Sequence, residues 1–468
     1  MSFVPHSEDD QREMLRAIGA SSVTELYADI PERLMLDEPP DLPAALSEWE
    51  AVRLLHGIAA ENLRLTSFAG AGIYDHHVPA AVDHLIRRSE FYTAYTPYQP
   101  EVSQGTLQAI YEFQTMVCRL TGMEVANASM YDGASAAGEA AVMALSVTGR
   151  RRVLLAGTLH PHYRRVVETY LSGLEASVET VEGGGQGVLD PDAVGDRLDG
   201  ETACVLVQSP NFFGAVEELE ALAEAAHAAG ALLVAAVADP LSLALLRPPG
   251  DLGADVVVAE GQLFGNAPSF GGPVVGLFAT RSRYIRRMPG RIVGATLDAE
   301  GRSGYVLTLQ TREQQIRREK ATSNICTNQG LNALAATIYL ALVGKRGLWE
   351  IAEAAVRSAH YARERLQDVE GVELLHPEAH VVREFAVRTR EDSRTILRRG
   401  LEVGLLAGVS LSRFPGLGTP DGLLLAFTEK HTRPEIDALV RVVAGSGGPA
   451  LGPSSGSAAD PGGVRRDA

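Results

Sequence analysis

Short apolar runs alternate with helix-like patterns from about residue 100 to residue 280. Each run is continuous rather than alternating, which is typical of strands buried on both faces of a sheet. The predicted strands cover residues 153–156, 203–208, 232–237, 255–259 and 274–278. Helices are predicted between them over residues 134–147, 161–171 and 217–229. Strand and helix repeating in this order predict an α/β domain with a mostly parallel sheet and helices on both faces.

The pattern over residues 1–60 predicts an acidic N-terminal helical arm. Ser7 followed by Asp10 is a capping-box start for a first helix. A second helix is expected over residues 46–55, after a proline-rich break. We expect this arm to pack on the main body rather than to carry a separate function.

The pattern after residue 321 predicts a smaller α+β domain. It is helical to residue 367 and then contains short strands and one helix, over residues 372–375, 384–387, 394–400 (the helix) and 422–427. Of the 24 residues from 445 to 468, 18 are Gly, Ala, Ser or Pro, which predicts a disordered tail. The predicted division is a helical arm (1–60), a large α/β domain (61–335), a small α+β domain (336–444) and the tail (445–468).

Charge and hydropathy exclude several classes of function. The 468 residues carry a net charge of −17, from 42 basic and 59 acidic side chains. Because Lys and Arg bind phosphate backbones, this balance argues against nucleic acid as a partner. The longest apolar run, residues 231–238, is far shorter than the ~20 residues that cross a bilayer, so no membrane span is expected. The first ten residues also lack the features of a secretory signal.

The three cysteines, Cys118, Cys204 and Cys326, lie far apart and form no CxxC pair. This spacing argues against a disulfide framework and against a zinc site, so no metal is expected. It fits a reducing compartment, and the cytoplasm is the expected location.

Two glycine-containing segments resemble anion-binding loops to different degrees. Residues 183–187 (GGGQG) lack a GK[ST] ending and no helix follows at once, so we interpret them as a turn. Residues 133–137 (GASAA) open a long helix, where free N–H groups, the helix dipole and the Ser135 hydroxyl favour an anion. Close helix–sheet packing by small residues explains this second segment equally well.

Polar side chains follow the predicted strands at the edge where open α/β sheets bind ligands. His160 either faces a crevice there or is a hydrogen-bonded structural residue. Asp239 can pair with a cofactor ring nitrogen or cap the next helix. Pyridoxal-phosphate enzymes of the aminotransferase-like fold place such an Asp on one strand and the Schiff-base lysine just after the next. Here that second position holds Gln262, which cannot form an imine.

An irregular segment at residues 91–101 (FYTAYTPYQPE) places a tyrosine at every third position, Tyr92, Tyr95 and Tyr98. It follows the glycine-rich segment 68–77 (FAGAGIYDHH), whose glycines permit close backbone approach. Because buried hydroxyl groups need hydrogen-bond partners, a binding surface or pocket wall is favoured over packing of these rings in the core.

Several long motifs together resemble the P-protein (glycine decarboxylase) family of the glycine cleavage system, and within it subunit 1 of the two-subunit form. They are FAGAGIYDHH, YTPYQPEVSQGTLQ, YDGASAAGEA, ADPLSLALLRPPGDLGADVVVAEGQ, SFGGP and REKATSNICTNQGL. The resemblance covers residues 1–445 and excludes the tail. It implies the fold-type I pyridoxal-phosphate-dependent transferase fold.

The resemblance also implies a two-subunit enzyme. Two homologous subunits form an α2β2 heterotetramer, in which subunit 2 (the β chain) carries pyridoxal phosphate and its lysine. This chain is then the lysine-free homologue, with no coenzyme bound covalently. The complex decarboxylates glycine, releases CO2 and transfers the aminomethyl group to the lipoyl arm of the H-protein.

Site residues follow from the same resemblance as hypotheses. The residues expected to reach the partner's pocket, for glycine or the lipoyl arm, are Tyr74, His76, His77, Tyr92, Tyr95 and Tyr98. The positions expected to be vestigial cofactor-pocket residues are Ser135, His160, Asp239 and Gln262. The chain is therefore expected to have no catalytic residue of its own, because the Schiff-base lysine is absent near Gln262.

Two rival interpretations remain. The chain has only three lysines, Lys320, Lys345 and Lys430. A self-sufficient pyridoxal-phosphate enzyme would need Lys320, which lies in a charged run some sixty residues beyond the expected position. The other rival is a structural or regulatory pseudoenzyme that only stabilises subunit 2.

Overall fold

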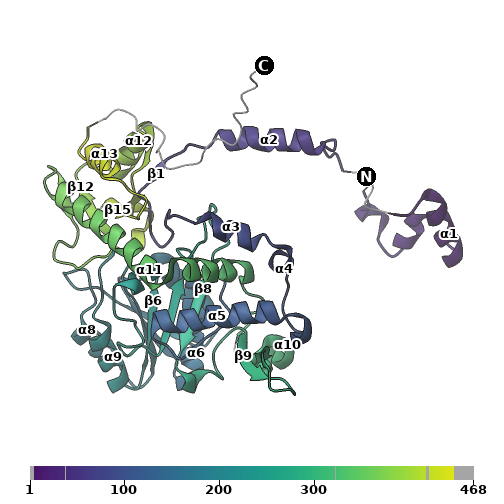
Figure 1. Cartoon of the computed structure of the whole chain (residues 1–468), viewed down its shortest axis with the longest axis horizontal. Helices are drawn as coiled ribbons and strands as arrows, with labels where there is room; N and C mark the ends of the chain where they lie inside the picture. The colour runs from purple at the N-terminus through teal and green to yellow at the C-terminus, as the bar shows by residue number, and fades with distance from the viewer. Residues whose placement is uncertain (1–4, 37, 39, 322, 418–420, 447–468) are drawn as a thin grey trace. The chain divides into compact units, whose positions relative to one another are not determined.

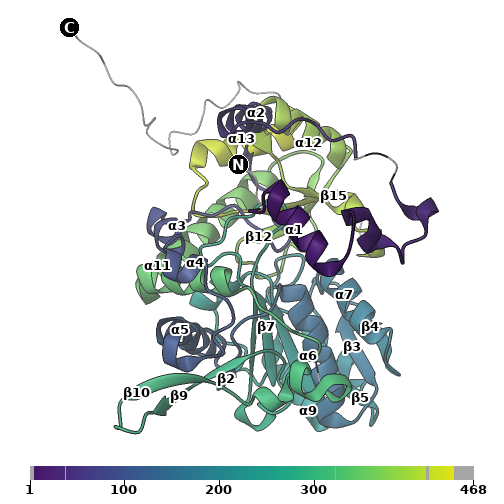
Figure 2. The same ribbon diagram turned by 90° about the vertical axis from the view of Figure 1, so that its right-hand side faces the viewer.

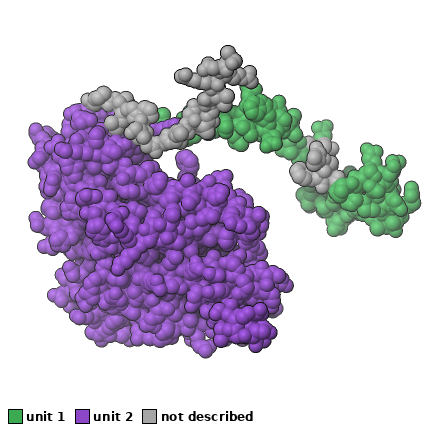
Figure 3. All heavy atoms as spheres, viewed as in Figure 1, with its two compact units in different colours: residues 1–63 green, residues 64–468 purple. Residues whose placement is uncertain are grey.

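A computed structural model of the chain describes residues 5–36, 38, 40–321, 323–417 and 421–446. The chain divides into two compact units, Met1–Leu63 and Arg64–Ala468, coloured separately in Figure 3. Each unit is described by itself. Most of the predicted tail, from residue 447 on, lies outside the described residues.

The first unit contains helices α1 (Glu8–Ile18) and α2 (Glu48–Ala60). Two 3-10 turns lie between them, η1 (Val23–Tyr27) and η2 (Glu32–Leu34). The capping box predicted at the start of α1 is confirmed, since the Asp10 amide donates to the Ser7 hydroxyl at 3.2 Å and the Ser7 amide donates to the Asp10 carboxylate at 2.7 Å. No side chain of either helix is buried.

The second unit is built on a seven-stranded sheet (Figure 1). In spatial order its strands are β2 (Val125–Ala126), β8 (Gly276–Thr280), β7 (Val256–Glu260), β6 (Leu232–Val237), β5 (Thr202–Gln208), β3 (Arg152–Ala156) and β4 (Ser177–Val181). Every neighbouring pair is parallel except the two that include β8. Strands β5 to β8 are buried along their whole length. The predicted mostly parallel α/β sheet is confirmed.

Helices pack on this sheet, as Figure 2 shows for α6 and α7 beside the strands. The helices are α5 (Gln104–Thr121), α6 (Gly133–Thr148), α7 (Pro161–Leu171), α8 (Pro191–Gly195), α9 (Leu219–Ala228) and α11 (Gly330–Gln367). Helix α6 lies against β5 to β8 and is rich in Gly and Ala. A Cβ at Gly138 would lie 2.8 Å from the Tyr170 ring of α7, so small residues allow these helices to approach. Helix α11 is interrupted at Gly344.

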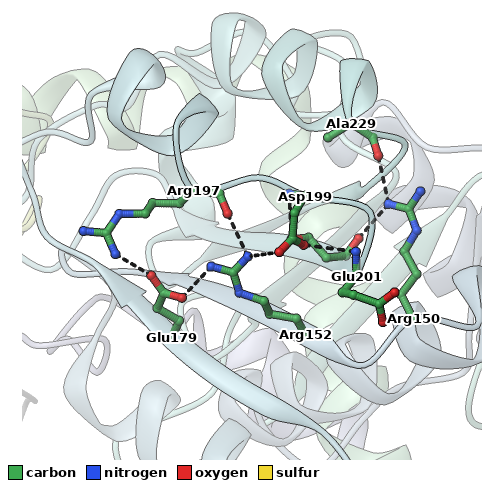
Figure 4. A network of polar contacts seen from close by, with 8 residues as sticks. Arg150, Arg152, Glu179, Arg197, Asp199, Glu201 and Ala229 are labelled. Carbon is green, nitrogen blue, oxygen red and sulfur yellow. Dashed lines mark hydrogen bonds and ion pairs between the residues drawn. The ribbon is translucent and has the colours of Figure 1, made fainter.

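The starts of β3, β4 and β5 are joined by a polar network (Figure 4). Arg152 pairs with Asp199 at 2.7 Å and with Glu179, which also binds Arg197. Arg150 donates hydrogen bonds to two backbone carbonyls, those of Thr202 and Ala229. This network ties down the amino ends of the strands, and the carboxyl ends lie at the opposite edge of the sheet.

A second, antiparallel sheet follows in the order β11 (Val372–Leu374), β12 (Glu384–Thr389), β15 (Gly422–Ala426) and β14 (Val409–Ser410). Helices α12 (Ser393–Glu402) and α13 (Arg433–Val443) belong to the same part of the chain as this sheet. The short strand β1 (Thr66–Ser67) pairs in parallel with β13 (Leu405–Leu406). This pairing anchors the segment that begins at residue 66 to the C-terminal part of the chain. The boundary placed at residues 335 and 336 stays a prediction.

A hairpin of β9 (Ile292–Leu297) and β10 (Ser303–Thr308) was not predicted from the sequence. It packs beside α5. The remaining short helices are α3 (Ala80–Ile86), α4 (Ser89–Tyr92) and α10 (Gln314–Arg317). Among the described residues, no helix combines the length and apolarity needed to cross a membrane.

Candidate functional site

The carboxyl ends of the parallel strands bring together the residues singled out in the sequence. His160 is the N-cap of α7, just past β3. Asp239 follows β6 and precedes the 3-10 turn η4 (Pro240–Ala244). Glu260 is the last residue of β7, and Gln262 lies two positions on. All four side chains are buried.

The glycine-rich segment 68–77 fills the space above this edge. The Ala71 amide donates to Glu384 Oε1 at 2.7 Å, and the Ala71 carbonyl lies 2.9 Å from His160 Nε2. A Cβ at Gly70 would lie 2.2 Å from Glu384 Oε1, so only glycine permits this approach. The backbone therefore occupies the crevice that the strand ends would otherwise leave.

His160 is held as a neutral imidazole. Its Nδ1 accepts the His162 amide at 3.0 Å, so Nε2 carries the proton and donates to the Ala71 carbonyl at 2.9 Å. Burial lowers the pKa of His160 to about 4. Both ring nitrogens are used within the chain, which supports the structural interpretation of this residue.

Gln262 has all its hydrogen-bonding groups satisfied. Its Oε1 accepts the Tyr74 amide at 3.0 Å, and its Nε2 donates to the Tyr74 carbonyl at 3.1 Å and to the Asn266 carbonyl at 2.7 Å. The side chain is fully buried. A neutral amide thus bonds segment 68–77 to the end of β7, at the position where a lysine would be expected.

Asp239 is paired with Arg383, a residue that the sequence analysis missed. Arg383 Nε lies 3.0 Å from Asp239 Oδ2, and the two side chains are only 1% and 5% exposed. Burial raises the pKa of Asp239, while the guanidinium opposes that rise. The only signal in the sequence is a charged pair, Arg383 and Glu384, at the start of an apolar strand.

Tyr74 and Glu384 complete this buried cluster. The Tyr74 hydroxyl donates to Glu384 Oε2 at 2.9 Å, and the Tyr74 ring lies 5.5 Å from the Arg383 guanidinium. Burial raises the pKa of Glu384 to about 7. The adjoining cavity measures ≈10 Å³, whereas pockets for small molecules measure about 300–1,000 Å³.

The start of α6 is already occupied by carboxylates. Glu260 Oε2 accepts the Gly133 amide at 3.0 Å, and Asp132 Oδ1 accepts the Ser135 amide at 2.7 Å. Burial raises the pKa of Glu260 to about 8, although hydrogen bonds with the backbone of Gly133, Gln262 and Val275 oppose that rise. A Cβ at Gly133 would lie 2.0 Å from the Tyr163 hydroxyl. Close packing thus accounts for residues 133–137, and the helix end has no room for an external anion.

These contacts test whether the chain can hold pyridoxal phosphate, and the residues do not fit it. An amide stands where the imine-forming lysine is needed, and Arg383 holds the aspartate that would pair with the pyridine nitrogen. Chain carboxylates occupy the helix end that would bind the phosphate. Within the described residues, no group of three or more His, Cys, Asp or Glu is placed to hold a metal ion.

The predicted partner-facing residues separate into two groups. Tyr74 and His76 are buried, and His76 Nε2 lies 3.2 Å from the Asn266 carbonyl, so both side chains are engaged inside the chain. This burial argues against their reaching a partner, because segment 68–77 folds inward between its glycines. His77 is exposed, and its amide donates to Glu429 Oε1 at 2.6 Å.

The irregular segment of residues 91–101, called the tyrosine segment from here on, in contrast exposes its three tyrosines at the surface. Tyr92, Tyr95 and Tyr98 are 62%, 78% and 48% exposed. None of the three rings packs in the core, so the core-packing alternative does not describe them. The Tyr98 hydroxyl accepts a hydrogen bond from Arg291 at 3.2 Å.

The three lysines lie away from Gln262 along the chain. Lys320 is exposed in the 3-10 turn η7 (Arg318–Lys320). Lys430 pairs with Asp75 at 2.7 Å and so ties segment 68–77 to the C-terminal part. Lys345 lies in α11. None of them substitutes for a lysine after β7.

The chain has the fold of the fold-type I pyridoxal-phosphate enzymes. A sphingosine-1-phosphate lyase from Burkholderia pseudomallei matches with a TM-score of 0.63 at 16% identity, over 90% of this chain and 93% of that chain. The cysteine desulfurase CsdA from Escherichia coli matches with a TM-score of 0.60 at 13% identity, over 81% of this chain and 94% of that chain. At these identities the similarity shows the fold alone.

Closer relatives give the family. The glycine cleavage system P-protein family matches residues 1–443. A probable glycine dehydrogenase (decarboxylating) subunit 1 from Carboxydothermus hydrogenoformans is 52% identical over 95% of this chain and 100% of that protein. Its counterpart from Thermomicrobium roseum is 51% identical over 95% and 99%. A crystal structure of glycine decarboxylase (P-protein) in inhibitor-bound form has a TM-score of 0.87 at 44% identity, over 95% of this chain and 100% of that chain. The chain belongs to the glycine cleavage system P-protein family.

Proposed function

We propose that this chain is the coenzyme-free subunit of a two-subunit glycine decarboxylase. The observation that carries the proposal is the buried amide of Gln262, hydrogen-bonded to Tyr74 where the fold would need a lysine. Relatives named subunit 1 of glycine dehydrogenase, at about half identity over nearly the whole chain, support it. Because the fold is retained and the cofactor site is filled, the chemistry belongs to a second subunit.

The proposed partner is subunit 2, in an α2β2 heterotetramer. Subunit 2 supplies pyridoxal phosphate, which acts as the electron sink for decarboxylation. The complex releases CO2 from glycine and passes the aminomethyl group to the lipoyl arm of the H-protein. The free thiols of Cys118, Cys204 and Cys326 fit a reducing compartment, and we place the complex in the cytoplasm.

This chain contributes to the partner's active site through exposed side chains of the tyrosine segment and through His77. Tyr92, Tyr95 and Tyr98 present hydroxyl groups at the surface, and His77 is exposed as well. Hydroxyl groups at a subunit interface can bind a carboxylate and exclude water from the reacting centre. We assign these residues to positioning glycine or the lipoyl arm in the partner's site.

Co-expression with subunit 2, followed by assay of glycine–bicarbonate exchange, tests this function. Exchange is expected only when both subunits are present. Titrating subunit 2 with this chain separates a shared site from a scaffold. A scaffold raises the amount of active subunit 2 and leaves the glycine KM and the per-site turnover unchanged. Exchange by this chain alone would contradict the proposal.

The double substitution of Tyr95 and Tyr98 by Phe is expected to lower kcat/KM of the complex by about tenfold or more. The reason is that a hydrogen bond to a charged group contributes about 1.5–3 kcal/mol. The measurement is steady-state exchange on the purified complex. Tyr305→Phe, in the hairpin strand β10, is the control and is expected to leave kcat/KM unchanged. Unchanged kcat/KM in the double variant would remove the tyrosine segment from the site.

Gln262→Lys is expected not to convert the chain into a coenzyme-binding protein. A new amine at 262 still meets a filled crevice, with Asp239 held by Arg383 and the start of α6 held by Glu260. Visible absorbance after incubation with pyridoxal phosphate and borohydride reduction is the measurement, with subunit 2 as the positive control. A stoichiometric reducible band in the variant would show that the missing lysine is the only defect.

A further inference from the structure

A cavity of ≈310 Å³ lies beneath the tyrosine segment, between α4, α5 and the first turn of α11. Its lining is largely apolar, with rings and aliphatic side chains from all three elements. Tyr92, Tyr95 and Thr106, whose side chains carry hydroxyl groups, are also among the lining residues. Arg291 is the one lining residue of fixed charge among the described residues.

Arg291 has fewer partners than a buried guanidinium requires. The side chain is only 6% exposed. Its one hydrogen bond in the described part of the chain runs from Nη2 to the Tyr98 hydroxyl at 3.2 Å, and buried Nε has no acceptor. The nearest carboxylate, on Glu313, lies 3.6 Å from Nε, which is too far for a hydrogen bond. Burying a charge without such bonds is costly, so the site favours an added acceptor.

Glu313 is the only carboxylate within ion-pairing distance of Arg291 among the described residues. It lies beside a second guanidinium, that of Arg312, which donates to the carbonyls of Leu309 at 3.1 Å and Gly290 at 2.9 Å. Burial also raises the pKa of Glu313. The charges of Arg291 and Arg312 both act on this one carboxylate and oppose that rise.

The start of α11 adds a second source of positive potential. Gln329, the N-cap residue, makes no side-chain capping hydrogen bond within the described part of the chain. Residues 327–331 line the cavity, and a Cβ built on Gly330 would meet nothing within 4 Å. The first-turn amides of a helix have no intrahelical partner, and together with the helix dipole they favour an anion at such a position.

We infer that the cavity beneath the tyrosine segment is an anion-binding pocket, in which Arg291 and the first turn of α11 bind one carboxylate or phosphate group of a small molecule. The apolar walls leave room for a short body attached to that group. The inference adds a binding pocket to the proposed function. It rests on that function only where it names the two possible anions. A carboxylate source is glycine, and a phosphate source is the coenzyme of the partner subunit.

Calorimetric titration of the full-length chain with glycine and with inorganic phosphate, at low ionic strength and without chloride, tests the pocket. Saturable binding of at least one of them is expected. Arg291→Gln is expected to weaken that binding by about tenfold or more, because a charge-assisted hydrogen bond is lost. Arg302→Gln is the matched control, since Arg302 is exposed and pairs with Asp298 at 2.7 Å. The Arg302→Gln variant should bind the anion with the same affinity as the unmodified chain.

A second variant guards against a folding defect in Arg291→Gln. Gly330→Glu places a carboxylate in the open space at the helix start, where it stabilises the helix and competes with an external anion. It too is expected to lower affinity by about tenfold or more. Binding of glycine alone identifies the carboxylate source, and binding of phosphate alone identifies the phosphate source. Absence of saturable binding to the unmodified chain, or binding that both variants leave within twofold, overturns the pocket.

The same titration separates this inference from the proposed function. Anion binding is measured on this chain without subunit 2, whereas exchange requires the complex. Loss of exchange in a complex whose free subunit binds anions normally would point to the proposed function as the failed step. Normal exchange in a complex whose free subunit binds no anion would instead overturn the pocket.

Discussion

Replacing Arg383 by Met is expected to destabilise the second unit by about 3–5 kcal/mol, because it leaves a buried carboxylate without its partner. Met keeps most of the length and volume of the side chain, so the main change is loss of the guanidinium. Asp239 is only 5% exposed and has no other charged partner within 4.0 Å in the described part of the chain. The midpoint of urea unfolding at neutral pH is the measurement.

Arg388→Met is the matched control for this prediction. Arg388 lies on the same strand, β12, but its 3.4 Å contact with Glu373 is at the surface, where an ion pair contributes about 0–1 kcal/mol. The double variant Asp239→Asn with Arg383→Met removes both charges and is expected to recover much of the loss. A cost for Arg383→Met no larger than that of the control would show that the buried pair does not stabilise the second unit.

The positions of His160, Asp239 and Gln262 could be predicted from the sequence because they depend on local rules. Continuous apolar runs mark parallel strands, and the residues just beyond their carboxyl ends lie at one edge of the sheet. Their partners could not be predicted in this way. Asp239 follows a strand of one sheet and Arg383 precedes a strand of the other, and no local pattern encodes a pair so distant in sequence.

The tyrosine segment and segment 68–77 show the same limit. Both are irregular, polar and rich in aromatic rings, so the sequence pattern predicted the same role for both, at the partner's pocket. The structure buries Tyr74 and leaves Tyr95 at the surface. The difference comes from Gly70, which lets the first segment pass against Glu384, whereas Pro97 and Pro100 prevent a regular helix from running through the second. Which segment enters the crevice depends on tertiary contacts.

The Glu384 carboxyl gives the cluster a dependence on pH whose direction can be derived. Its pKa is raised to about 7, from 4.5, chiefly by burial and in part by Asp239. Between these two values the folded chain keeps a proton that the unfolded chain has released. Because the folded state then binds more protons, its stability falls as pH rises through this interval, by up to about 1.4 kcal/mol per pH unit for this group.

Glu384→Gln is therefore expected to match the unmodified chain near pH 4.5 and to exceed its stability by about 3 kcal/mol at pH 8. The amide preserves both contacts, because its oxygen accepts the Ala71 amide and its nitrogen donates to the Tyr74 hydroxyl, which turns to accept. Urea unfolding across this range measures the difference, and the buried histidines cancel because both proteins contain them. Glu373→Gln, at the exposed position of strand β11, should differ in stability from the unmodified chain by the same small amount at every pH. A variant no more stable than the unmodified chain at pH 8 would mean that Glu384 is ionised in the fold, with Arg383 neutralising it as well as Asp239.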